Sequence, residues 1–233
     1  MKLSIIIPVY NEEQTIGEVV ERVLAVDLGG LESEVIIADD GSSDGTREAI
    51  ATSGWSRDPR VRAYHSRINV GKGAAVRLGL SYATGDIILI QDADLELDPR
   101  EFSVLLAPIL AGQAKVVFGS RFLKPVMRIS VRTRIANRAL TMLTNVLFGA
   151  RLTDMETAYK AFRREVLDGI RLRCVAFDFE PEFTAKVLMK GHRILEVPIS
   201  YHPRRVDEGK KIRWVDGLDA VYTLLKCRFA AVP

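Results

Sequence analysis

The sequence of 233 residues is long enough for one substantial α/β domain or two small ones, and its 48% hydrophobic content argues against a disordered chain. The net charge of +3 is too small for the basic surface of a nucleic-acid-binding protein, so no nucleic-acid partner is expected. Cys174 and Cys227 lie far apart in the sequence, which argues against a zinc site or a disulfide framework and favours a reducing, cytoplasmic setting.

Strands and helices are predicted to alternate through the first half of the chain. Apolar, β-branched runs predict buried strands at residues 3–9, 35–38, 87–90 and 116–118. Asn11 followed by Gln14 predicts a capped helix start before Ile16, and another helix follows Asp98 and Pro99 over residues 102–110. This alternation is typical of a Rossmann-like α/β fold, a mostly parallel sheet flanked by helices with its binding crevice at the carboxyl ends of the strands. Four polar residues are expected at that crevice: Asn11, Asp39, Asp40 and Asp92.

The second half of the chain begins after Arg121 and has a different character. Residues 127–152 predict one or two amphipathic helices, followed by a helix at 179–190, a strand at 194–201 and a final helix from about residue 215. No linker or low-complexity segment interrupts the sequence. We therefore expect a single domain over residues 1–233, with a nucleotide-sugar-binding half at 1–121 and an acceptor-binding half at 122–233.

The composition of the basic segment predicts contact with a membrane surface. Five arginines and no acidic residue lie between residues 128 and 151, which suits the interface of an anionic membrane, with Leu140, Leu143 and Leu147 expected to be buried there. An ordinary amphipathic surface helix is the competing interpretation. No apolar stretch approaches the roughly 20 residues needed to span a bilayer, and the chain begins directly with a strand pattern rather than an export signal. The expected location is therefore cytoplasmic and peripheral, at the inner face of the membrane.

Asp92 and Asp94 directly follow the strand at residues 87–90. Side chains alternate along an extended backbone, so these two carboxylates should point to the same side. Carboxylate oxygens suit Mg²⁺ or Mn²⁺, which commonly share their coordination with the phosphates of a bound substrate. A solvated acidic loop explains these residues about as well when they are considered alone, so the surrounding motifs must decide.

Six short segments together resemble a known enzyme family. The glycine patterns of dinucleotide-binding folds and of P-loops are absent. The order and spacing of the segments instead resemble the family 2 inverting glycosyltransferases of the A-type fold, and more narrowly the dolichol-phosphate mannose synthase-like branch that makes polyprenyl-phosphate sugars. The segments are residues 7–12, 39–46, 69–73, 92–95, 119–121 and 196–198.

The resemblance implies a set of residues that hold the donor. The nucleotide, sugar and diphosphate would be held by Pro8, Tyr10, Glu12, Ile37, Asp39, Lys72, Asp92, Ala93 and Lys210. Whether Lys210 or Lys211 reaches the diphosphate is left open. The metal would be held by Asp92, Asp94 and Glu96, and Glu96 stands where relatives often have Gln, which leaves the preferred metal and donor open.

The resemblance also implies how the acceptor is bound. Arg121, Arg134 and Arg204 would hold an acceptor phosphate, and Asp94 and Arg121 would be the catalytic residues. A phosphate acceptor is already anionic, so positioning and charge neutralisation suffice without a general base. A sugar hydroxyl acceptor would require a base, for which the sequence offers Asp154, Glu180 and Glu182.

These expectations define one preferred function and two rivals. The preferred function is transfer of a hexose, mannose from GDP-mannose or glucose from UDP-glucose, to polyprenyl or dolichyl phosphate with inversion at the sugar carbon. The rivals are a transferase of the same fold that acts on a glycan hydroxyl and a noncatalytic membrane-surface module that binds nucleotides. The resemblance leaves room for a separate membrane-protein partner, because many relatives carry transmembrane helices that this sequence does not show.

Overall fold

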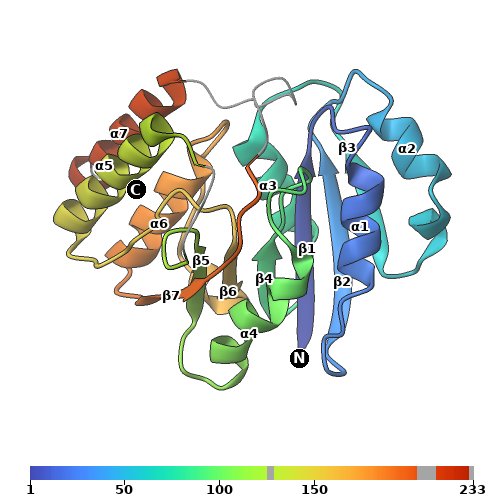
Figure 1. Ribbon diagram of the computed structural model, residues 1–233, viewed down its shortest axis with the longest axis horizontal. Helices are drawn as coiled ribbons and strands as arrows, with labels where there is room; N and C mark the ends of the chain where they lie inside the picture. Colours follow the sequence, from blue (N-terminus) through green and yellow to red (C-terminus); the bar gives the residue numbers. More distant parts are fainter. Residues whose placement is uncertain (125–128, 204–213, 231–233) are drawn as a thin grey trace.

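The computed structural model describes residues 1–124, 129–203 and 214–230, and within them seven strands form one sheet (Figure 1). The strand order is β3-β2-β1-β4-β6-β5-β7. The strands are β1 (Lys2–Val9), β2 (Glu32–Asp39), β3 (Val61–His65), β4 (Ile87–Ile90), β5 (Val116–Ser120), β6 (Lys160–Arg163) and β7 (Ile194–Pro198). The helices are α1 (Ile16–Leu24), α2 (Thr46–Thr52), α3 (Lys72–Tyr82), α4 (Phe102–Leu110), α5 (Val131–Phe148), α6 (Phe179–Met189) and α7 (Trp214–Phe229).

The sheet is parallel except at β6, as expected for a mostly parallel α/β fold. Strand β1 pairs in parallel with β2 and β4, whereas β6 runs antiparallel to both β4 and β5. Lys160, the first residue of β6, therefore lies opposite Ile90 at the end of β4 and opposite Phe118 near the end of β5. As a consequence, the segment that leads into β6 lies at the same edge of the sheet as the ends of β1, β2, β4 and β5.

Two apolar layers cover the two faces of the sheet. Ile5 and Ile7 of β1 pack with residues of α1 and α4, and the intervening Ile6 packs with residues of α3 and α6 on the opposite face. The central strands are apolar at nearly every position because both of their faces are buried. A third apolar cluster lies between α5, α6 and α7, which pack against one another at the β7 end of the sheet (Figure 1).

Several element boundaries differ from those predicted. The four predicted strands of the first half are confirmed, but β3 and β6 were not predicted. The predicted capping by Asn11 is wrong: α1 begins at Ile16, and Asn11 instead accepts a 2.8 Å hydrogen bond from the backbone N–H of Ser43. Asn11 thereby connects the end of β1 to the turn after β2.

The basic segment forms a single helix, α5, and its leucines face inward. Leu140, Leu143 and Leu147 pack against the apolar cluster shared with α6 and α7, so the prediction that they face a membrane is wrong. Elsewhere along α5 a different set of apolar residues is exposed. No helix among the described residues has both the length and the apolar content required to cross a bilayer.

Candidate nucleotide-sugar and acceptor site

The chain adopts unusual backbone conformations where it leaves β1 and β4. Asn11 has a φ of 49° and Leu95 has a φ of 60°, and they are the non-glycine residues with positive φ in the described chain. Such conformations are unfavourable for residues other than glycine and are concentrated at binding and catalytic sites. Their position at the carboxyl edge of the sheet supports this edge as the functional site.

Asp39 and Asp40 end β2 but have different partners. Asp39 is fully buried and accepts hydrogen bonds from the backbone N–H of Ser42 at 2.9 Å, from Arg47 at 2.8 Å and from His65 at 2.9 Å. Burial alone would raise the pKa of Asp39, but the bonds from Ser42, His65 and Arg47 outweigh it and hold the pKa below its ordinary value. The donor-binding role of Asp39 stays a prediction; in this structure the carboxylate organises the turn after β2.

Asp40 supports the loop that precedes α3. Its carboxylate accepts hydrogen bonds from the side chain of Asn69 and from the backbone N–H groups of Val70 and Gly71, at 3.0, 3.0 and 2.6 Å. These bonds fix the N-terminus of α3, where Lys72 is the first residue.

Lys72 lies between two carboxylates, Asp92 and Glu180. Its ammonium is 2.8 Å from Oδ1 of Asp92 and 2.9 Å from Oε1 of Glu180. Burial would lower the pKa of Lys72, but the charges of Asp92 and Glu180 outweigh it and hold the pKa above its ordinary value. Lys72 therefore stays positively charged at the point where the sequence predicts the donor diphosphate.

Asp92, Asp94 and Glu96 are all half-buried, whereas the intervening Ala93 is buried. Asp94 accepts a bond from the backbone N–H of Glu96, and Glu96 accepts a 2.8 Å bond from the hydroxyl of Tyr201. No group of three acidic, histidine or cysteine side chains in the described chain forms a complete metal site. The carboxylate oxygens nevertheless fit Mg²⁺ or Mn²⁺, whose remaining ligands would be diphosphate oxygens and water.

Arg121 and Asp154 form a buried, two-point ion pair. Nε and Nη2 of Arg121 each lie 2.7 Å from an oxygen of Asp154, and the backbone N–H of Arg121 donates to the same carboxylate at 2.9 Å. The guanidinium carbon also lies 5.2 Å from the ring centre of Tyr201. Arg121 was predicted to bind an acceptor phosphate, but in this structure its Nε and Nη2 atoms bind Asp154. The Nη1 atom takes no part in this ion pair.

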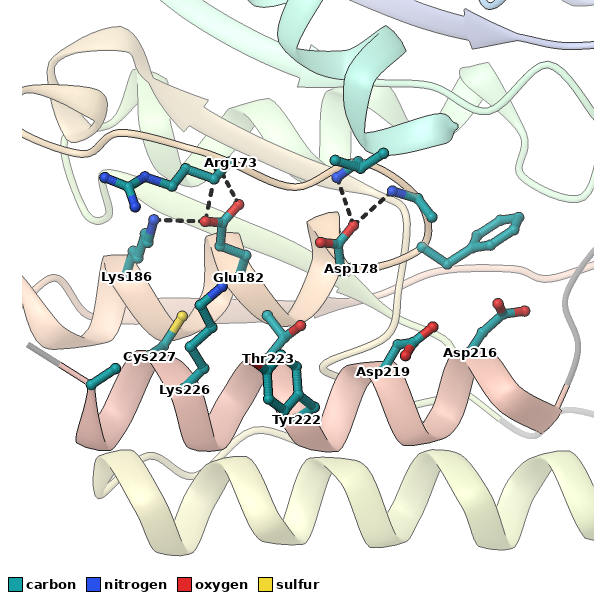
Figure 2. A pocket seen from close by; sticks show the side chains of 14 residues that line it. Arg173, Asp178, Glu182, Lys186, Asp216, Asp219, Tyr222, Thr223, Lys226 and Cys227 are labelled. Atoms are coloured by element: carbon teal, nitrogen blue, oxygen red, sulfur yellow. Dashed lines mark hydrogen bonds and ion pairs between the residues drawn. The ribbon is translucent and has the colours of Figure 1, made fainter. Parts of the chain in front are cut away.

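The three predicted base candidates all have strong partners in this structure. Asp154 holds Arg121, and Glu180 holds Lys72. Glu182 accepts bonds from the backbone N–H groups of Arg173 and Cys174 and from the ammonium of Lys186. Glu182 lines a pocket of about 290 Å³ formed mainly by residues of α6, α7 and the segment before α6. Figure 2 shows the Glu182 side chain among them. No predicted donor, acceptor or metal residue of the described chain lines that pocket.

The remaining predicted residues are distributed as follows. Pro8 and Ile37 are buried within their strands, Tyr10 and Glu12 are half-buried just beyond β1, and Arg134 is exposed in the first turn of α5. Ile37 packs in the core on the α1 side of the sheet, so its predicted contact with a nucleotide stays a prediction. Arg204, Lys210 and Lys211 lie outside the described residues.

Three residues near the crevice were not predicted as site residues. Tyr201 connects Glu96 to Arg121 through its hydroxyl and its ring. Glu156 and the fully buried Lys160 lie in and just after the segment that leads into β6. In the sequence, Lys160 is visible only as a charged residue next to a short apolar run. Its place near the crevice follows from the antiparallel pairing of β6 with β4 and β5, which the sequence did not predict.

Helices α5 and α7 each expose an apolar stripe, and we call the two stripes together the α5–α7 surface. Spacings of three, four or seven residues place each set on one side of its helix. The stripe on α5 is Val131, Ile135, Met142 and Val146, and that on α7 is Leu218, Tyr222, Leu225 and Phe229. Arg132, Arg134 and Arg138 are exposed on α5 as well.

Comparison with solved structures identifies the fold. The chain superposes on glucosyl-3-phosphoglycerate synthase from Mycobacterium tuberculosis in complex with Mn²⁺, UDP and phosphoglyceric acid, with a TM-score of 0.75 and 23% identity. The match covers 100% of this chain and 79% of that one. A complex of the same synthase with Mg²⁺ and UDP gives a TM-score of 0.73 at 22% identity, over 97% of this chain and 79% of the other. The fold is therefore that of an A-type glycosyltransferase.

Sequence comparison identifies relatives and the family. Glycosyltransferase AglD of Haloferax volcanii is 30% identical over 214 residues, which are 88% of this chain but only about a third (34%) of the length of AglD. Undecaprenyl-phosphate 4-deoxy-4-formamido-L-arabinose transferase of Salmonella paratyphi A is 28% identical over 227 residues, 97% of this chain and 67% of the relative. Residues 4–171, well over half of the chain, match the profile of glycosyl transferase family 2. The chain therefore belongs to glycosyl transferase family 2.

Proposed function

We propose that this glycosyltransferase moves a hexose from a nucleotide diphosphate sugar to a polyprenyl phosphate at a membrane surface, with inversion at the sugar carbon. GDP-mannose is the first candidate donor and UDP-glucose the second. The name of the Salmonella relative, an undecaprenyl-phosphate sugar transferase, supports an acceptor of this class.

The main support for a lipid acceptor is the α5–α7 surface. Val131, Ile135, Met142 and Val146 are between 64% and 75% exposed, which is unusual for four large apolar residues on one helix. Exposed arginines lie on the same helix, so it combines apolar side chains with positive charge, as interfacial helices do. Helix α5 begins shortly after Arg121, so a lipid held at this surface could extend its phosphate toward Arg121.

The partners of the acidic side chains support a phosphate rather than a hydroxyl acceptor. Asp154, Glu180 and Glu182 are engaged by cations or by backbone N–H groups, so each would have to give up these partners to act as a base. A phosphate monoester is already ionised near neutral pH and needs no base. Binding and orientation by Arg121 would then provide much of the catalysis on the acceptor side.

On the donor side, Lys72 would neutralise part of the charge of the diphosphate. Asp94 and Glu96 would hold a divalent cation together with the diphosphate oxygens, and Asp92 would join them on releasing Lys72. Such a cation, when bound, neutralises charge on the departing nucleotide. The fully charged state of Lys72 suits this role because the same ammonium can move from Asp92 to a phosphate oxygen.

The direct test is product analysis with purified protein, a short polyprenyl phosphate and a panel of GDP and UDP sugars with Mg²⁺ or Mn²⁺. We expect labelled sugar in the organic phase, loss of the product on chelation, and at least about a hundredfold loss of rate in Asp94→Asn. Asp58→Asn, which changes a carboxylate in a distant turn, should behave as the wild type. Transfer only to hydroxyl acceptors, or nucleotide binding without any transfer, would contradict the proposal.

A further inference from the structure

Seven ionisable side chains gather where β4 and β5 end and β6 begins. Three are cations and four are carboxylates: Lys72, Arg121, Lys160, Asp92, Asp154, Glu156 and Glu180. The ion pairs described above join Lys72 to Asp92 and Glu180, and Arg121 to Asp154. The ammonium of Lys160 donates to the carbonyl oxygens of Met155 and Thr157 and lies 4.2 Å from the ring centre of Phe118.

Glu156 is the carboxylate left over from this pairing. Its Oε1 atom is buried and has no hydrogen-bond partner in the described structure. Among these seven side chains, four negative charges would face three positive ones if every group were ionised. An ionised carboxylate with a buried oxygen that lacks a partner is costly, and its protonated form is less so.

The surroundings of Glu156 favour the protonated form near neutral pH. Burial, and then the negative charge of Glu180, raise the pKa of Glu156 to about 7, although Lys160 and Arg121 act in the opposite direction. Asp154, on the same segment, raises the pKa further. Two further charged groups lie on the surrounding elements: Lys72, next to Glu180, and Glu196 of β7, which accepts a bond from the backbone N–H of Asp154.

Glu156 also interacts electrostatically with the residue proposed to bind the acceptor, Arg121. Glu156 is two residues from Asp154, which holds the guanidinium of Arg121 in place. The electrostatic interaction between Glu156 and Arg121 is direct enough to influence the pKa of each group. An added negative charge here would compete with an acceptor phosphate for Arg121.

We infer that Glu156 determines the pH range over which the acceptor phosphate binds. Uncharged, it adds no negative charge near the Arg121–Asp154 pair, and as a carboxylate it repels the phosphate. The inference rests on the proposed function, because it requires a phosphate acceptor. Glu156 is in this sense a residue that determines acceptor specificity rather than one that reacts.

The test measures KM for a short polyprenyl phosphate and KM for the donor as the pH is raised through about 7. In the wild type we expect the acceptor KM to rise about tenfold above this pH while the donor KM stays constant. In Glu156→Gln the acceptor KM should stay low and flat, because the amide cannot ionise. Ionisation of the acceptor itself is the same for both proteins. Glu165→Gln, which removes an exposed carboxylate paired with Lys115, should keep the wild-type profile.

A second measurement needs no substrate. A carboxyl group whose pKa is raised on folding stabilises the protein below its unfolded pKa of 4.5, and this stability is lost as the pH rises through about 7. The thermal midpoint of Glu156→Gln should therefore exceed that of the wild type above pH 7, and the difference should shrink toward pH 4.5. Equal midpoints throughout would show that Glu156 carries no raised pKa and would overturn the inference.

The remaining outcomes separate this inference from the proposed function. A rise in acceptor KM that persists in Glu156→Gln would overturn the inference alone. Loss of kcat with polyprenyl phosphate at every pH in this variant would also overturn it, since Glu156 would then act in the transfer step itself rather than on acceptor binding. Failure of the wild type to use any polyprenyl phosphate would overturn the proposed function and the inference with it.

Discussion

Arg121 and Asp154 form the most strongly desolvated ion pair at the carboxyl edge of the sheet. The Asp154 side chain is fully buried and that of Arg121 is 12% exposed. Two hydrogen bonds from the guanidinium to the carboxylate fix the guanidinium plane, and the backbone N–H of Arg121 donates a third. The ring centre of Tyr201 lies 5.2 Å from the guanidinium carbon. Such a pair adds little net stability, but removing one partner leaves a buried charge without compensation. The pair therefore presents a preoriented cation to an incoming anion.

The change Asp154→Asn should destabilise the protein by about 3–5 kcal/mol, because Asn keeps the shape of the side chain but leaves Arg121 without a counter-charge. Urea unfolding at neutral pH measures this as a lower midpoint with an unchanged slope. Glu165→Gln breaks an ion pair with similar chemistry at an exposed position and should leave the midpoint unchanged. A loss for Asp154→Asn no larger than that of this control would show that Arg121 is compensated by other groups.

Single residues also show how far the sequence could predict the site. The position of Asp39, Asp40 and Asp92 at strand ends is confirmed, because the end of an apolar parallel strand is visible in the sequence, whereas their roles stay predictions. The partners of Asp40, which are Asn69, Val70 and Gly71, were not foreseen, since they come from a loop 29 to 31 residues away. Glu156 escaped prediction for a similar reason: its environment is assembled from α6, β6 and the end of β5.

At the scale of elements, the N-terminus of α3 illustrates how backbone packing places a functional side chain. Gly71 has a φ of 129° and donates its N–H to Asp40 at 2.6 Å. The first turn of α3 is hydrogen-bonded to the segment before α6: the backbone N–H groups of Gly73 and Ala74 donate to the carbonyl groups of Ala176 and Val175, respectively. Lys72 is thereby held between α3 and α6, within reach of both Asp92 and Glu180.

Gly71→Ala should disrupt this arrangement. A Cβ atom there would lie 2.5 Å from the carbonyl oxygen of Val175, and a φ of 129° is unfavourable for any residue with a side chain. We expect a loss of about 2–4 kcal/mol of stability and, because Lys72 moves, weaker stabilisation by nucleotide diphosphates in thermal unfolding. Gly112→Ala is the matched control, since Gly112 also has a positive φ but has open space around it, and it should cost only about 1 kcal/mol. Equal effects of the two changes would contradict a packing role for Gly71.

The two strands that the sequence did not predict have a physical explanation. Strand β3 lies at the edge of the sheet, and Arg62 and His65 break its apolar pattern. Strand β6 has four residues and begins with Lys160, a charged residue at a fully buried position. The carbonyl oxygens of Met155 and Thr157 satisfy that charge, and this compensation is visible only in the folded structure. The apolar central strands were predictable because both of their faces are buried.

At the scale of the whole molecule, the outer helices at one end of the sheet leave large apolar side chains exposed. At the β7 end, α5 and α7 lie side by side (Figure 1). They pack on each other through inward leucines and still expose a second apolar stripe each. A stripe of this size is unfavourable in water unless another apolar phase covers it. The exposed arginines of α5 favour an anionic membrane as that phase.

Membrane binding should therefore depend on the exposed stripe and not on the inward leucines. We expect the purified protein to float with vesicles containing anionic phosphatidylglycerol, and to do so less as salt is added, because arginine–phosphate attraction is screened. The double change Ile135→Ser and Met142→Ser should weaken binding at least about tenfold without lowering stability, since both side chains are exposed in the free protein. Val104→Ser with Leu110→Ser, which removes two exposed apolar residues from α4, is the matched control and should bind as the wild type. Indifference to anionic lipid, or equal binding by the α5 and α4 variants, would exclude the α5–α7 surface as the membrane contact and would remove the main support for a lipid-linked acceptor.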